Sequence, residues 1–133
     1  MQDFGSRMER LAIELVRLRS VVGTEGELGI TLWIKDRLSG LPYFAMNPDR
    51  LVFEAIPGDK LGRGSLMAIF EAARPTSDAV LLIGHTDTVG LSDYAAAEPF
   101  ATDPSLLPQA LQAMELDAEA KADLESGDYL FGR

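Results

Sequence analysis

The sequence contains no cysteine and only one histidine, His85. The absence of cysteine excludes disulfide bonds and thiolate metal ligands, and it is compatible with a cytoplasmic setting. The single histidine excludes any metal or acid–base chemistry that needs two histidines from this chain alone. This sequence therefore supplies at most one imidazole to a functional site.

Basic residues are also scarce, since 12 lysines and arginines stand against 21 acidic residues and give a net charge of −9. They form no basic stripe, and we expect neither nucleic acid nor an anionic membrane surface as a partner. No apolar run approaches the roughly 20 residues that span a bilayer. The N-terminus also lacks the apolar stretch of a signal peptide. The sequence therefore predicts a cytoplasmic protein that binds no nucleic acid and no membrane.

Two helices are predicted near the N-terminus. The first covers residues 6–19, because apolar residues recur every three or four positions on one face: Met8, Leu11, Leu15 and Leu18. The second covers about residues 25–38. Thr24 and Glu27 have the spacing of a capping box at its start, and Gly40 provides a stop at its end.

The middle of the chain favours strands. Residues 51–56 and 65–71 are rich in apolar and β-prone residues, and they predict a hairpin with a long connection. The run at 79–84 is the most apolar in the chain and does not alternate with polar residues, which is typical of a central strand covered on both faces. Short helices are predicted at 103–114 and 117–126. Together these patterns predict an α/β fold.

His85 and Asp87 directly follow that apolar run. In open α/β sheets, ligands bind beyond the carboxyl ends of the strands. A neutral imidazole there can bind zinc through one nitrogen while a carboxylate such as that of Asp87 orients the other. His-x-Asp alone is a weak pattern, and a structural histidine that caps the strand end is the commoner interpretation.

Several segments together resemble one protein family. The run LLIGHTDTVG (81–90) resembles the first zinc-ligand motif of the aminoacylase, glutamate carboxypeptidase and desuccinylase family of two-zinc metallopeptidases. The ending GDYLFGR (127–133) is similar to the start of that family's next motif, and VRLRSVVGTEGE (16–27) is similar to its opening. The long acidic link before residue 127 resembles the arginine-utilisation branch. The resemblance covers nearly the whole chain in the right order.

This resemblance implies a fold, a cofactor and roles for two residues. His85 would be a zinc ligand, and Asp87 would be the catalytic aspartate that orients or tunes it. Residues 1–133 would be the N-terminal portion of a three-layer α/β/α zinc-peptidase catalytic domain. That domain would be incomplete, because its remainder and a dimerisation domain are absent. The cofactor would be zinc, two ions per active site, with cobalt or manganese as substitutes.

The resemblance also implies an activity for the parent protein. It would be a homodimeric hydrolase that cleaves an amide bond in an acyl-amino acid or small peptide. The isolated chain is expected to be inactive, because it holds one zinc ligand of the set. The alternative is a non-catalytic α/β binding or regulatory domain in which His85 is structural.

Overall fold

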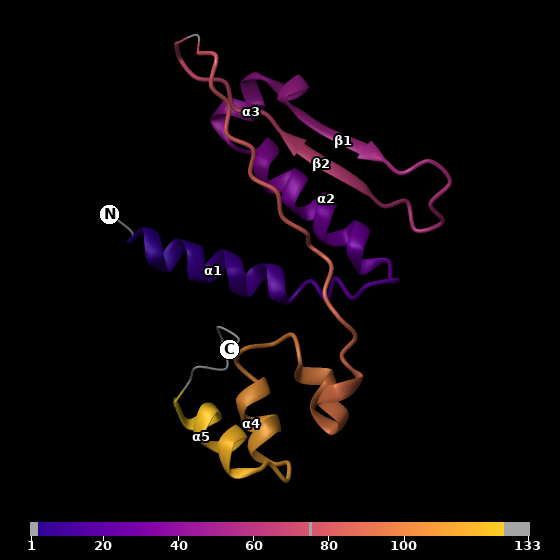
Figure 1. Cartoon of the computed structure of the whole chain (residues 1–133), viewed down its shortest axis with the longest axis vertical. Coiled ribbons are helices and arrows are strands. Elements are labelled where there is room, and N and C mark those ends of the chain that lie inside the picture. Colours follow the sequence, from indigo (N-terminus) through magenta and orange to yellow (C-terminus); the bar gives the residue numbers. More distant parts are fainter. Residues whose placement is uncertain (1–2, 75, 127–133) are drawn as a thin grey trace. The chain divides into compact units, whose positions relative to one another are not determined.

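The computed structural model describes residues 3–74 and 76–126. The chain divides into two compact units, one formed by Ser20–Thr88 and the other by Met1–Arg19 together with Val89–Arg133. Figure 1 gives the course of the chain and the labels of its elements. No helix among the described residues is long and apolar enough to cross a membrane.

The Ser20–Thr88 unit combines helices with a small sheet. Its elements are α2 (Gly26–Ser39), α3 (Pro42–Met46), the short 3-10 helix η1 (Pro48–Arg50) and the strands β1 (Leu51–Ala55) and β2 (Gly64–Ala68). The second predicted helix is confirmed to within a residue at each end. It stops before Leu41, whose backbone is extended (ψ 140°) because Pro42 follows it, and Pro42 then begins α3.

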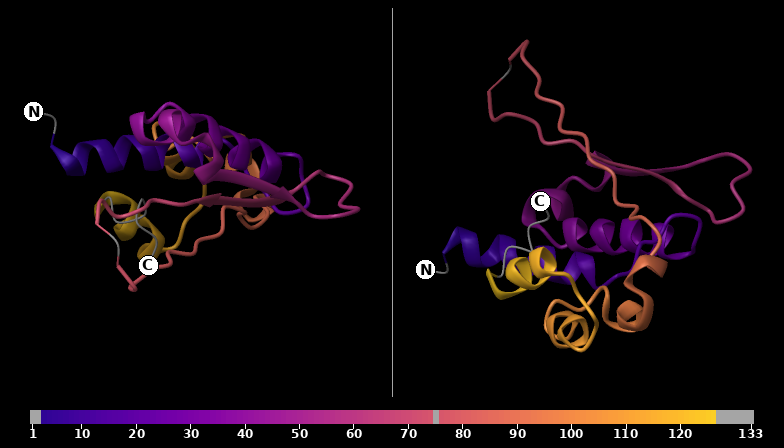
Figure 2. Two further views of the ribbon diagram at one scale, coloured as in Figure 1. Left: turned by 90° about the horizontal axis from the view of Figure 1, so that it is seen from above. Right: turned by 60° about the horizontal axis from the view of Figure 1, so that its bottom comes forward.

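The predicted hairpin is also confirmed. The two strands pair antiparallel, from Leu51 opposite Ala68 at one end to Ala55 opposite Gly64 at the other. Burial alternates along β1, where Leu51 is buried and Val52 is exposed. The sheet lies against α2, and both views in Figure 2 show the loop that joins the strands extending beyond their ends.

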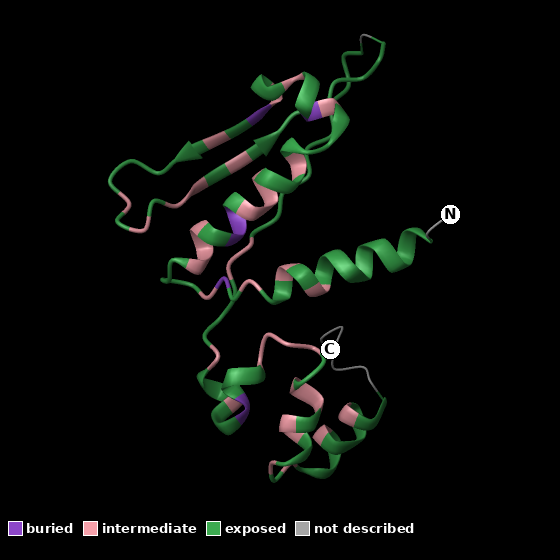
Figure 3. Cartoon of the chain, turned by 180° about the vertical axis from the view of Figure 1, so that it is seen from behind, coloured by how far each residue is buried: buried purple, intermediate pink, exposed green. Residues whose placement is uncertain are grey.

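The core of this unit is small. Three apolar residues, Ile30, Phe44 and Leu51, are buried, each with less than a tenth of its surface exposed. Figure 3 shows how few positions are buried along α2, α3 and β1. Beside Phe44, the Tyr43 ring stacks at 4.2 Å between centroids on Phe70. Because this apolar core is so small, polar contacts contribute much of what fixes the loops of this unit.

The prediction of a central strand at 79–84 is wrong for this structure. The segment is neither strand nor helix, and Val80, Leu81, Leu82 and Ile83 are 80–89% exposed. A central strand needs hydrogen-bonded neighbours on both edges. The sheet of the described residues contains only β1 and β2, and neither pairs with this run. The apolar sequence is thus present without the partners that would make it a strand.

The other unit is helical over its described residues. Its elements are α1 (Phe4–Val16), the 3-10 segment η2 (Ser92–Phe100), α4 (Leu107–Gln112) and α5 (Ala118–Ser126). The amphipathic first helix and the last helix are confirmed, although α1 begins and ends earlier than predicted. Gly127, which follows the last helix in the sequence, lies outside the described residues.

The helix predicted to start at Asp103 instead starts at Leu107. The Asp103 carboxylate accepts hydrogen bonds from the Ser105 N–H (2.9 Å) and from the Arg17 guanidinium (3.1 Å), which hold a turn there. These bonds keep the pKa of Asp103 below its usual value. Pro108 stands in the first turn of the real helix, where a missing N–H costs nothing.

Gly64→Ala tests the strand register. A Cβ at Gly64 would overlap the Glu54 carbonyl oxygen and the edge of the Phe53 ring, so we expect a loss of about 1–3 kcal/mol in the free energy of unfolding. Gly29→Ala is the matched control, because Gly29 faces open space in α2 and alanine there should stabilise by up to about 1 kcal/mol. Urea unfolding followed by Trp33 fluorescence measures both, and an unchanged Gly64→Ala variant would contradict the register.

Candidate functional site

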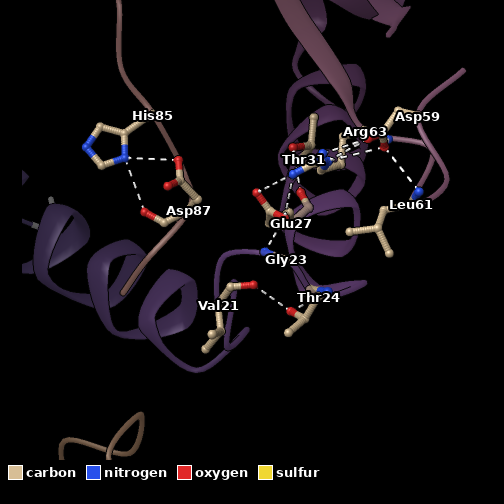
Figure 4. Close-up of polar contacts among 11 residues, drawn as sticks. Val21, Gly23, Thr24, Glu27, Thr31, Asp59, Leu61, Arg63, His85 and Asp87 are labelled. Carbon is tan, nitrogen blue, oxygen red and sulfur yellow. Dashed lines mark hydrogen bonds and ion pairs between the residues drawn. The ribbon is translucent and has the colours of Figure 1, made fainter. Parts of the chain in front are cut away.

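The two residues singled out in the sequence lie in contact. The Nδ1 atom of His85 is 3.2 Å from the Asp87 carboxylate and 3.1 Å from the Asp87 backbone oxygen (Figure 4). A neutral ring that carries its proton on Nδ1 donates to these oxygens and keeps the Nε2 lone pair for a ligand. The His85 side chain is 84% exposed, so it does not serve as a packed core residue.

A short parallel bridge holds the backbone around this pair. The Val22 N–H donates to the Thr88 oxygen at 2.9 Å, and the Thr88 N–H donates to the Ser20 oxygen at 2.9 Å. Ser20 is 3% exposed, and its hydroxyl donates to the Thr86 oxygen. The backbone is therefore fixed on both sides of Asp87. Val21, which lies in the family-like segment 16–27, thus pairs with Thr88, directly after the His-x-Asp segment.

The turn before α2 differs from the predicted capping box. The Glu27 carboxylate accepts a hydrogen bond from the Gly23 N–H at 2.8 Å, whereas a capping box would use the Thr24 N–H. The Thr24 hydroxyl donates to the Val21 oxygen at 2.6 Å and accepts the Gly26 N–H at 3.3 Å. The cause is the left-handed backbone of Gly23 (φ 79°), which begins the turn and gives Glu27 an earlier donor.

An ion cluster that the sequence did not reveal lies beside this turn. We define the ion cluster as Glu27, Asp59 and Arg63 (Figure 4). The Arg63 guanidinium is 2.6 Å from Asp59 and 3.1 Å from Glu27. The two carboxylate side chains are only 10% and 12% exposed. Hydrogen bonds from the Arg63 side chain and N–H lower the pKa of Asp59 to about 2, and the side-chain bonds that Arg63 donates to Asp59 also raise the pKa of Arg63.

The donor set falls short of a complete metal site. No group of three or more histidine, cysteine, aspartate or glutamate side chains gathers anywhere in the part of the chain that the structure describes. His85 with Asp87 fits one metal ligand and the carboxylate that orients it, because the ring's second nitrogen keeps its lone pair. The second family-like motif, at 127–133, lies outside the described residues.

The described part of the chain thus combines helices, a two-stranded sheet and an exposed His–Asp pair of defined orientation. The chain is similar to Protein RocB of Bacillus subtilis (strain 168), with 34% identity over 127 residues that cover 96% of this chain and 22% of RocB. It is also similar to the Uncharacterized protein YqjN of the same organism, with 35% identity over 92% of this chain and 22% of YqjN.

The chain thus spans about a fifth of the length of the curated relatives it matches, 22% of each. No family model matches the chain, and neither does any solved structure. The likeness therefore concerns one portion of each relative.

The low pKa of Asp59 predicts a specific response to acid. Its pKa is about 2 in the folded chain against an ordinary value of 3.8, so the ionised carboxylate stabilises the fold. That contribution is fully present above about pH 4 and is lost as the pH falls through 2. The free energy of unfolding should therefore fall between pH 5 and pH 2.5 more for the wild type than for Asp59→Asn. Urea titrations read by Trp33 fluorescence measure it, and equal acid losses would refute it.

Proposed function

We propose that this chain is part of the catalytic domain of a metal-dependent hydrolase, with His85 as one zinc ligand and Asp87 as its orienting carboxylate. The observation that carries the proposal is the contact between the His85 Nδ1 and the Asp87 carboxylate at 3.2 Å. It leaves an exposed imidazole with a defined orientation and one nitrogen facing solvent. Metal-bound histidines are commonly oriented by a carboxylate in this way.

The substrate class follows from the family that the sequence resembles. We propose an amide bond in an acyl-amino acid or small peptide as the target, and zinc, or cobalt or manganese in its place, as the metal. Zinc bound at such a site would lower the pKa of a water and polarise the carbonyl of the amide. Asp87 would accept a hydrogen bond from the Nδ1–H of His85 and so fix the tautomer and orientation of the ring.

We further propose that residues 1–133 are one portion of a three-layer α/β/α domain that other parts of a longer, homodimeric protein complete. The 22% coverage of both relatives supports this proposal. So does the exposed apolar run at 79–84, whose side chains are 80% or more exposed from Val80 to Ile83. Inside a larger sheet, that run would gain neighbours on both edges and cover on both faces.

The alternative, a non-catalytic binding or regulatory domain with a structural His85, receives less support. A structural histidine normally packs or bridges buried groups, whereas the His85 side chain is 84% exposed and its ring contacts Asp87, two residues away. The two interpretations predict opposite effects of one substitution, and this makes them separable.

His85→Ala is that substitution. In this chain we expect it to change the free energy of unfolding by no more than about 0.5 kcal/mol, because exposed side chains contribute little to stability. In the longer protein we expect it to abolish metal-dependent hydrolysis of N-acyl-amino acids while leaving the melting temperature unchanged. A folding defect with retained hydrolysis would instead support the structural alternative.

Zinc titration of this chain tests the incompleteness of the site. Structural and catalytic zinc sites use three or four protein ligands, and no group of three or more such side chains gathers among the described residues. Calorimetry should therefore show no tight stoichiometric binding, and the chain should show no hydrolase activity. A tight isotherm with one or two zinc ions per chain that His85→Ala removes would contradict the proposed incompleteness.

A further inference from the structure

The segment that carries His85 and Asp87 has few anchors of its own. From residue 69 to residue 85, no described residue belongs to a helix or strand, and the apolar side chains before His85 face solvent. The anchors nearest the pair are the bonds that tie Thr86 and Thr88 to the residues before α2. The place of the pair therefore depends on how firmly that partner segment is held.

The partner segment is the 20–24 turn, by which we mean Ser20–Thr24. Its first three residues face the His-x-Asp segment through the parallel bridge. On its other side, the Gly23 N–H donates to the Glu27 carboxylate at 2.8 Å. The Thr24 hydroxyl closes the turn on itself through the Val21 oxygen at 2.6 Å. Glu27 thus reaches the turn from the first turn of α2.

Glu27 is in turn held by the hairpin loop. The Arg63 guanidinium spans the two carboxylates, with Nη1 at 3.1 Å from Glu27 and Nη2 at 2.6 Å from Asp59. Asp59 also accepts the Arg63 N–H at 2.9 Å and the Leu61 N–H at 3.2 Å, which fixes the loop around it. Charge-assisted bonds of this kind are stronger than neutral ones, and the planar guanidinium sets their directions.

We propose that the ion cluster of Glu27, Asp59 and Arg63 is a remote positioning device for the His85–Asp87 pair. It fixes the 20–24 turn through Gly23, and the turn fixes Thr86 and Thr88 on either side of Asp87. Arg63 and Glu27 are positioning residues, which touch neither His85 nor Asp87. Their relevance to hydrolysis rests on the proposed function, whereas the positioning itself concerns only this chain.

Arg63→Gln in this chain tests the positioning. We expect amide hydrogen exchange to accelerate about tenfold or more at Val22 and Thr88, since their bridge loses a charged support. The ring resonances of His85, the only histidine, should shift at fixed pH. Exchange at Ile34, inside α2, should stay unchanged.

Conservative variants keep the test decisive if Arg63→Gln folds poorly. Arg63→Lys retains the charge but can hold only one carboxylate well, so it should give a smaller acceleration at the same two amides. Glu27→Gln keeps an oxygen acceptor for the Gly23 N–H and should give an intermediate effect, whereas Glu27→Ala should match Arg63→Gln.

Arg50→Gln is the matched control. Arg50 forms a 2.6 Å ion pair with Glu71 within the same unit, away from the 20–24 turn, so its loss should leave Val22, Thr88 and the His85 signals unchanged. The proposal is overturned if Arg63→Gln leaves exchange at Val22 and Thr88 unchanged. It is equally overturned if Ile34 accelerates as much as they do, because the cluster would then be a general stabiliser.

The same variants separate this proposal from the proposed function. In the longer protein, Arg63→Gln should lower kcat at least about tenfold, in line with the exchange effect, with little change in KM. If His85→Ala leaves hydrolysis intact, the proposed function fails while the exchange results still stand. If His85→Ala abolishes hydrolysis and Arg63→Gln does not affect exchange, only the positioning role fails.

Discussion

Two backbone hydrogen bonds, from Val22 to Thr88 and from Thr88 to Ser20, join parts of the chain that are far apart in sequence. They matter because the apolar core of the Ser20–Thr88 unit is small and the segment that leads to His85 is exposed. Loop closure over such a long span is unfavourable unless the contacts at its ends are well made. The buried Ser20 hydroxyl adds a third contact at the same place. The geometry of the His85–Asp87 pair depends on this bridge.

Local patterns in the sequence predicted the local elements well. The helix at 4–16 follows from apolar periodicity, the helix at 26–39 from its start and stop signals, and the hairpin from two β-prone runs around a long connection. Each of these depends mainly on contacts between near neighbours in the chain. The contact of His85 with Asp87 was equally predictable, because a spacing of two residues brings the ring and the carboxylate within reach.

The errors concern contacts between distant residues. The run at 79–84 has the composition of a central strand, but the described part of the chain supplies no neighbouring strand to pair with it. The ion cluster was not predicted, because the spacing of Glu27 and Arg63 in the sequence does not indicate that α2 and the hairpin loop are in contact. The capping box shifted by one residue because the left-handed turn at Gly23 changed which N–H faces Glu27.

The parallel bridge is the feature on which both proposals converge, because it orients the pair for the proposed metal and receives the support of the ion cluster. Its most direct test is the through-hydrogen-bond scalar coupling between amide nitrogen and carbonyl carbon, measured by NMR on this chain. We predict couplings from the Val22 nitrogen to the Thr88 carbonyl and from the Thr88 nitrogen to the Ser20 carbonyl. Absence of both, with Thr88 exchanging as fast as an unprotected amide, would contradict the bridge and the positioning of His85 that depends on it.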